Sequence, residues 1–330
     1  MRSNGRASGF ALARMTSMPV VSVIVPAWNV AEFIPTAVRS VFAQSFEDLE
    51  LIVVNDGSPD TEALEVALSG YRNRPDTRYI VQENRGPSGA RNTGILHARG
   101  RFVAFLDGDD WWEPTYIEQQ LVRFSDDEAL DVVYCDARLT GDSVLAGRTF
   151  MDTTPSTGPV TLEALIALTC NVPTTCAVAR REAVVAAGLF DEQIRRCEDF
   201  DLWLRMSAQG SRFSYHRGVL AFHRLHPASA AADGVRMFES QLGVYRKLEA
   251  LLGASHQAAP LLREQIRRAD ADLALERSKQ LLMAGEYPQA VEALDAARRF
   301  YKSRKLALAS IGLRAAPGLV RRMYAGRPVR

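Results

Sequence analysis

The first hundred residues alternate between short apolar runs and longer segments whose apolar residues recur at helical spacing. The short runs are rich in β-branched residues, as is typical of strands buried on both faces. They cover residues 20–27, 49–58, 78–83 and 101–110. Amphipathic helices are predicted between them, over 32–44, from 58 onward and over 86–100. Strands that alternate with helices predict an α/β fold with a doubly wound, mostly parallel sheet.

Two of these helices have residues that favour a particular start. Ser58 followed by Pro59 predicts an N-cap and a first helical residue. Ser88 predicts the N-cap of the next helix, and Gly100 predicts its end.

The second half of the chain changes character at about Gly234. Before it, strands are predicted at 131–139 and 176–180, and helices that end at a glycine at 181–188 and 198–210. After it, the pattern is helical only. We therefore expect an α-helical C-terminal region over 233–330, behind an α/β domain over 19–232.

Composition restricts the class of protein. Apolar residues make up 47% of the chain, charged residues 24%, and the net charge is +1, which is typical of a globular protein with no overall attraction to nucleic acid. The four cysteines form no CxxC pair, so we expect buried thiols in a reducing compartment rather than a zinc ribbon.

The N-terminal residues lack the pattern of a secretory targeting signal. Residues 1–18 contain arginines but no sustained apolar core, so we expect a disordered extension, or a true start at Met15 or Met18, rather than a signal peptide. No uninterrupted apolar stretch reaches the length of a membrane-spanning helix. We expect a cytoplasmic protein.

Three polar motifs follow the predicted strands of the first half. They are "PAWN" at 26–29, "NDGSPD" at 55–60 and "LDGDD" at 106–110. In doubly wound sheets, ligands bind beyond the carboxyl ends of the strands. The coincidence of three such motifs predicts a ligand site at this edge.

The "LDGDD" motif is the strongest of the three. Asp107 and Asp109 flank Gly108, and clustered carboxylate oxygens suit a hard divalent cation that also binds substrate phosphates. An ordinary Asp/Gly turn is the alternative. Asp56 also has two interpretations. Asp-Gly is a hairpin signal, but the helix that follows favours a ligand-facing loop, in which Asp56 could accept a hydrogen bond from a base or ribose.

Further candidates lie in the second half of the α/β region. Glu198 and Asp199 begin a helix, where they are either dipole partners or include a general base. "HRLHPASA" contains His223, Arg224 and His226, which suit a metal ion or a phosphate. Trp203 is expected in the core rather than against a sugar.

Taken together, these motifs resemble the family-two inverting glycosyltransferases, which have the GT-A fold. The resemblance extends from about Val20 to Ser229 and rests on ordered motifs: "VSVIVPAWN", "VVNDGSPD", "ENRGPSGARNTGI", "FLDGDDWW", "GLFDE", "EDFDLWLRM" and "HRLHPAS". It implies a GT-A catalytic domain over 19–232, a nucleotide-diphosphate-sugar donor and Mg2+ or Mn2+. Of the possible nucleotides it favours UDP, with GDP and dTDP left open.

The resemblance also implies roles for individual residues. The nucleotide would be contacted by Pro26, Ala27, Asn29, Asp56 and Arg91. The DxD motif would place Asp109 on the metal and Asp107 on the ribose or metal, and His226 would complete the metal shell or face the diphosphate. Arg224 would face a phosphate. Asp199 would be the catalytic base, with Glu198 as the second candidate.

The expected reaction is transfer of a sugar to a hydroxyl of a saccharide, lipid-linked or protein acceptor, in cell-surface polysaccharide, glycolipid or glycoprotein synthesis. The acceptor loops are expected between Asp142 and Thr175. A non-catalytic nucleotide-sugar-binding or scaffold protein is the alternative. A nucleotidyltransferase is a weaker one, because "PAWNVAEF" lacks the Gly-rich, lysine-bearing loop that it would need.

The last thirty residues, 301–330, contain eight Lys or Arg and no Asp or Glu. Two interpretations remain open. They form either a helical face in peripheral contact with the inner face of an anionic membrane, or a solvated or disordered basic end. The oligomeric state does not follow from the sequence.

Overall fold

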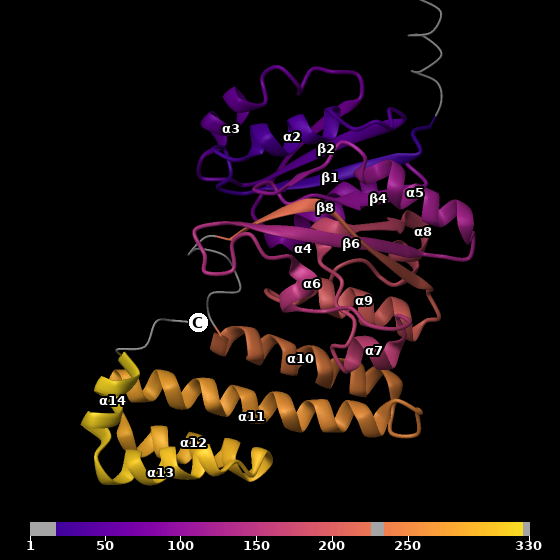
Figure 1. Cartoon of the computed structure of the whole chain (residues 1–330). Helices are drawn as coiled ribbons and strands as arrows, with labels where there is room; N and C mark the ends of the chain where they lie inside the picture. Colours follow the sequence, from indigo (N-terminus) through magenta and orange to yellow (C-terminus); the bar gives the residue numbers. More distant parts are fainter. Residues whose placement is uncertain (1–17, 226–233, 326–330) are drawn as a thin grey trace, which may run out of the picture. The chain divides into compact units, whose positions relative to one another are not determined.

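The computed structural model describes residues 18–225 and 234–325, so the expected N-terminal extension and His226 lie outside the described residues. The chain divides into two compact units (Figure 1). Of the described residues, 18–161 and 169–225 form the first unit, and 162–168 and 234–325 form the second. The sequence pattern did not indicate that 162–168 belongs with the C-terminal helices.

The first unit contains an eight-stranded sheet in the order β3-β2-β1-β4-β7-β6-β8-β5. The strands are β1 (Val21–Ala27), β2 (Leu49–Asp56), β3 (Thr77–Gln82), β4 (Phe102–Phe105), β5 (Trp111–Trp112), β6 (Val132–Gly141), β7 (Ala177–Arg180) and β8 (Phe213–Leu225). The six strands predicted from apolar runs are all present. The sequence pattern did not predict β5 or β8.

The pairing of neighbouring strands changes from parallel to mixed half-way across the sheet. Strands β3, β2, β1 and β4 are parallel, which agrees with the predicted doubly wound arrangement. Beyond β4, the pairings β4–β7, β7–β6 and β8–β5 are antiparallel, and β6–β8 is parallel. The described sheet is therefore mixed, and its parallel half brings the carboxyl ends of β1, β2 and β4 to one edge.

Helices cover both faces of this sheet. Those of the first unit are α2 (Ile34–Phe42), α3 (Thr61–Ala67), α4 (Gly86–His97), α5 (Tyr116–Asp126), α6 (Phe150–Thr153), the 3-10 turn η1 (Thr174–Cys176), α8 (Arg181–Ala186) and α9 (Glu198–Ala208). Successive strand residues point to opposite faces, so one strand supplies two cores.

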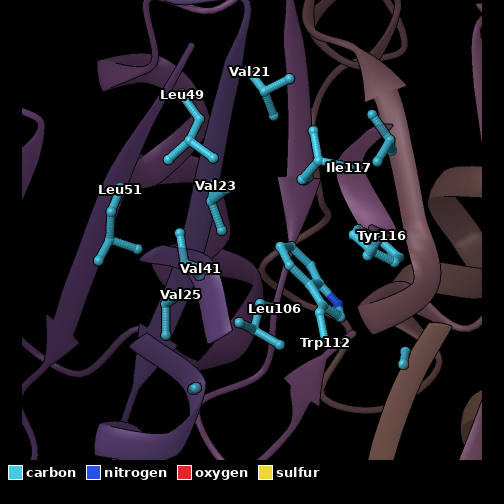
Figure 2. Close-up of a cluster of buried hydrophobic side chains, with 14 of the residues drawn as sticks. Val21, Val23, Val25, Val41, Leu49, Leu51, Leu106, Trp112, Tyr116 and Ile117 are labelled. Carbon is cyan, nitrogen blue, oxygen red and sulfur yellow. The ribbon is translucent and has the colours of Figure 1, made fainter. Parts of the chain in front are cut away.

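The first core contains Val21, Val23 and Val25 of β1 with apolar residues of α2 and α5 (Figure 2). Leu64 of α3 belongs to the same core. On the opposite face, a methyl carbon of Ile24 lies 2.4 Å from the position that a Cβ would take at Gly94 of α4. The glycine is therefore required for the close approach of helix to strand. Trp203 of α9 is 1% exposed, which confirms its predicted place in the core.

Two predicted helix starts were wrong, and in both cases a tertiary contact decides the start. Helix α3 begins at Thr61 instead of following a Ser58 cap, because Ser58 Oγ instead accepts a hydrogen bond from Asn29 N and donates one to Asp60. Helix α4 begins at Gly86 and contains Ser88, because Arg85 N is already held by Asp56. It also ends at His97, before the predicted Gly100.

The second unit is helical throughout its described residues, as predicted. It contains α7 (Leu162–Ile166), α10 (Gly234–Leu252), α11 (Ala259–Ala284), α12 (Tyr287–Tyr301), α13 (Arg304–Ala315) and α14 (Pro317–Ala325). Tyr245 of α10 donates a hydrogen bond to the Ile166 carbonyl, which ties α7 into this unit. Among the described helices, none has both the length and the apolar character needed to cross a bilayer.

Candidate functional site

The loop after β1 is held against the loop after β2. Asn29 has a positive φ of 55°, and its N–H donates to Ser58 Oγ at 2.6 Å. The N–H of Ala31 donates to Asp60 Oδ2 at 2.8 Å. Pro26 and Ala27 end β1 directly before these hydrogen bonds. The residues predicted to line the nucleotide therefore lie where the two loops hold each other in place.

Asp56 ends β2 and is 2% exposed. Its Oδ1 accepts hydrogen bonds from Gln82 Nε2 at 2.6 Å and from Arg85 N at 2.9 Å. Its second oxygen makes no hydrogen bond to any described residue. A carboxylate that is fixed through one oxygen presents the other in a defined direction, as recognition of a base or ribose requires.

The turn after β4 depends on Gly108. A Cβ at this position would lie 2.9 Å from Val30 Cγ2 and 3.2 Å from the Pro26 carbonyl oxygen, so only glycine allows the turn to pass this close to the end of β1. The Asp110 N–H donates to the Asp107 carbonyl at 3.0 Å and closes the turn. The two aspartates of the DxD motif therefore lie beside the predicted nucleotide residues.

The three aspartates of this turn have different surroundings. Asp110 is 1% exposed, and its carboxylate binds His223 Nδ1 at 3.0 Å and Arg224 N at 2.8 Å. Although burial opposes it, the Asp110 carboxylate raises the pKa of His223 to about 9. Asp110 thus ties β8 to the turn, and this leaves Asp107 and Asp109 as the candidates for ligand binding.

Arg224 lies at the same place. Its Nε donates to the Asp109 carbonyl at 3.0 Å. Its guanidinium carbon lies 4.8 Å from the ring centroid of Phe33 and 5.1 Å from that of Trp111. The cation is held beside the DxD turn, where it can contribute positive charge toward a phosphate.

Arg91 of α4 connects two carboxylates that are far apart in the sequence. It is 5% exposed, and it donates to Asp107 Oδ1 and to Glu198 Oε1, both at 2.7 Å. Although burial opposes it, these two carboxylates raise the pKa of the guanidinium. The contact joins the DxD turn to the first residue of α9.

The start of α9 is set by its own backbone and by neighbouring residues. Cys197, just before the helix, has a left-handed φ of 60°. Glu198 is buried against Arg91, and burial raises its pKa although the Arg91 cation opposes this. Asp199 is half-buried, and its Oδ2 accepts a hydrogen bond from Thr174 Oγ1 at 2.7 Å. Asp199 is the carboxylate of this pair that has no cationic partner among the described residues.

The segment leading into α9 is clamped to α4. Asn92 donates to the Phe190 carbonyl at 2.8 Å and accepts from the Phe190 N–H at 2.9 Å. Arg85 Nε donates to Glu192 Oε2 at 3.0 Å. The sequence motif "GLFDE" contains Phe190 and Glu192, but a role in positioning α9 could not be derived from it.

A divalent cation is compatible with the residues at the DxD turn. Asp107 uses one oxygen for Arg91, and its other oxygen makes no hydrogen bond to a described residue. The described residues contain no group of three or more His, Cys, Asp and Glu side chains that could hold a metal by themselves. A site with one or two carboxylates suits Mg2+ or Mn2+, which retain waters and substrate phosphates as ligands. The predicted ligand His226 lies outside the described residues.

The candidate site therefore collects residues that are far apart in the sequence. The ends of β1, β2 and β4 contribute Asn29, Asp56 and the DxD turn, and Arg91 links that turn to the carboxylates that start α9. The sequence pattern predicted no structural contact for Asp110, Asn92 or Thr174. Their partners are distant in sequence, so no local pattern could have revealed them.

Comparison with known proteins shows the family to which the chain belongs. Residues 22–185 match the model of Glycosyl transferase family 2. An uncharacterized glycosyltransferase of Rickettsia typhi, RT0329, is 32% identical over 228 residues, which cover 68% of this chain and 70% of that protein. The chain belongs to glycosyl transferase family 2.

Other relatives match in different proportions. The uncharacterized glycosyltransferase EpsJ of Bacillus subtilis is 42% identical over 118 residues, which cover 36% of this chain and about a third, 34%, of EpsJ. The Escherichia coli protein WfaP, a UDP-Glc:alpha-D-GlcNAc-diphosphoundecaprenol beta-1,3-glucosyltransferase, is 27% identical over 236 residues, 70% of this chain and 87% of WfaP.

Solved structures share the fold. TarS residues 1–349 of S. aureus, in complex with UDP, superpose with a TM-score of 0.60 at 21% identity, over 94% of this chain and 93% of that chain. The mannosyltransferase PcManGT of Pyrobaculum calidifontis, in complex with GDP-Man and Mn2+, gives a TM-score of 0.61 at 21% identity, over 94% and 85%. The predicted GT-A fold is confirmed.

Proposed function

We propose that the first unit transfers a sugar from a nucleotide-diphosphate sugar, with UDP as the favoured nucleotide, to an acceptor hydroxyl. The observation that carries the proposal is the junction at Arg91. One buried guanidinium binds both a DxD carboxylate and the first residue of the base-bearing helix. Membership of glycosyl transferase family 2 supports the same reaction class.

The donor half is assigned from the strand ends. The free oxygen of Asp56 would receive a hydrogen bond from the base or ribose. Asp107 and Asp109 would hold Mg2+ or Mn2+, which when bound stabilises negative charge on the departing diphosphate. PcManGT carries Mn2+ with its donor, and this is consistent with a metal site here. Arg224 adds positive charge at the same turn.

The acceptor half is assigned to α9. Asp199 takes the proton from the acceptor hydroxyl, whose oxygen attacks the anomeric carbon from the face opposite the diphosphate. The new glycosidic bond forms as the bond to the diphosphate breaks, so the anomeric centre inverts. Thr174 fixes the orientation of the Asp199 carboxylate. Glu198, paired with Arg91, is the less suitable base because its carboxylate is already bound.

The acceptor class is proposed from the relatives. WfaP, by its name, acts on a sugar linked to diphosphoundecaprenol, and it is matched over most of its length. A lipid-linked saccharide acceptor in cell-surface polysaccharide or glycolipid synthesis is therefore the first class to test.

The donor site is tested by calorimetry with UDP, GDP and dTDP, each with and without Mn2+. Wild type is compared with Asp109→Ala and with a control, Asp48→Ala, which removes an exposed aspartate that precedes β2. We expect one nucleotide to bind the wild type in a metal-dependent way. Asp109→Ala should abolish this metal-dependent binding, and Asp48→Ala should retain it. Catalysis is tested by nucleotide release in Asp199→Asn. Metal-dependent binding with no release, for the wild type and every acceptor class tried, would favour the non-catalytic alternative.

A further inference from the structure

The two C-terminal helices of the second unit have a fixed inner face. Leu313 of α13 is 2% exposed and belongs to a small core with residues of α11 and α12, and Leu306 and Val320 pack against the same core. Asp295 of α12 accepts a hydrogen bond from Ser310 and forms an ion pair with Arg314. Residues 304–325 are therefore anchored helices, and their outer face is defined.

That outer face carries large apolar side chains. Leu308 and Ile311 of α13 are 70% and 59% exposed, and Leu319 and Met323 of α14 are 59% and 61% exposed. Leu308 and Ile311 are three residues apart, and Leu319 and Met323 are four apart, so each pair lies on one side of its helix. We name these four residues the α13–α14 surface.

The same segment has an uncompensated positive charge. Residues 301–325 contain six Lys or Arg and no Asp or Glu. Arg314 is paired with Asp295. The other five cations, which form no ion pair with any described residue, are Lys302, Arg304, Lys305, Arg321 and Arg322. Exposed apolar side chains and unpaired cations in one helical segment suit the interface of an anionic bilayer.

We propose that the α13–α14 surface binds an anionic lipid bilayer. The apolar side chains enter the interface, and the five cations face the lipid phosphates. A second copy of the chain fits less well, because a symmetric interface would bring the same cations of both copies together. A nucleic acid would satisfy the cations but would leave the four apolar side chains against a charged backbone. The proposal does not depend on transferase activity.

Sedimentation of the full chain with vesicles tests the proposal. The vesicles are phosphatidylcholine with or without phosphatidylglycerol, at low and high salt. We expect binding only to the anionic vesicles, and weaker binding at high salt. Leu308→Gln/Ile311→Gln and Arg321→Glu/Arg322→Glu should each weaken this binding by about tenfold or more. The control Val66→Gln/Leu96→Gln removes two apolar side chains that are 74% and 62% exposed on the first unit, and it should bind as wild type does.

Several outcomes would overturn the proposal. The first is that the wild type does not bind anionic vesicles. The second is that the Leu308→Gln/Ile311→Gln variant binds them as well as the wild type does. The third is that the control variant loses as much binding as the Leu308→Gln/Ile311→Gln variant. Analytical ultracentrifugation completes the test. A wild-type dimer that this variant converts to monomer, without vesicle binding, would assign the surface to a second copy. Circular dichroism and the unfolding midpoint should be unchanged in the variants, because all the substituted side chains are exposed.

Discussion

Replacement of Arg91 by methionine should destabilise the first unit strongly. The side chains of Arg91 and Glu198 are 6% and 12% exposed, and that of Asp107 is 29% exposed. After Arg91→Met, water can still reach Asp107, but Glu198 is left as a buried charge without a counterion. Removal of one member of a buried ion pair costs about 3–5 kcal/mol. We expect about 3 kcal/mol here, since Glu198 retains limited access to water.

A double-mutant cycle separates this interaction from lost packing. Glu198→Gln alone should lower the free energy of unfolding less than Arg91→Met does, because Arg91 still pairs with Asp107. The double variant should be more stable than the sum of the single changes predicts, by a coupling of about 1–3 kcal/mol. Arg212→Met is the matched control. It removes a surface ion pair whose side chains are 58% and 40% exposed, and such a pair contributes about 0–1 kcal/mol.

Urea unfolding followed by tryptophan fluorescence measures these free energies. All four tryptophans lie in the first unit, so the signal reports on that unit. Burial raises the pKa of Glu198, and loss of the Arg91 cation raises it further. A raised carboxyl pKa favours the folded state below the unfolded pKa, and that stability is lost as pH rises through the folded pKa. The loss of unfolding free energy in Arg91→Met should therefore become smaller as the pH falls toward 5. A loss under about 1 kcal/mol, or strict additivity in the cycle, would refute the reasoning.

Three further predictions follow from single contacts. Gly94→Ala should lower the free energy of unfolding by about 1–3 kcal/mol, because the added methyl group overpacks α4 against β1. Gly70→Ala should lower it far less, because a Cβ there meets no atom within 4 Å. Equal unfolding midpoints of the two variants would contradict this. Burial first, and then neighbouring carboxylates, raise the pKa of Cys197 to about 12, so at pH 8 only about one thiol in 10,000 is ionised. Iodoacetamide should then label Cys197 far more slowly than a free thiol, as followed by mass spectrometry, and rapid labelling of the folded protein would oppose the burial argument. Thr174→Val removes the hydrogen bond to Asp199 and should lower kcat about tenfold, with little change in donor affinity. Thr174→Ser keeps the hydroxyl and should retain activity. An unchanged kcat in the valine variant would exclude the positioning role of Thr174.

The parallel half of the fold was predictable from sequence because its signals are local, and the candidate site was inferred from the motifs at its strand ends. The apolar run at Val21–Ala27 and its successors identify buried strands without knowledge of their partners. Since parallel strands end at one edge, the polar motifs at Asp56 and Asp107 could be assigned to a common site. The wrong helix starts at Ser58 and Ser88 show the limit of local patterns. In both places a contact with a distant residue replaced the expected cap.

The sequence by itself determined six of the eight described strands of the sheet and the polar residue types that follow the parallel ones. Only the tertiary structure decided which carboxylate has which partner. Arg91 meets Glu198 across 107 positions, and His223 meets Asp110 across 113. Such pairings depend on how β8 inserts into the sheet and on where α9 is clamped against α4. Periodicity reports a residue's face on its own element, but the partner across that face is fixed only when the elements pack together.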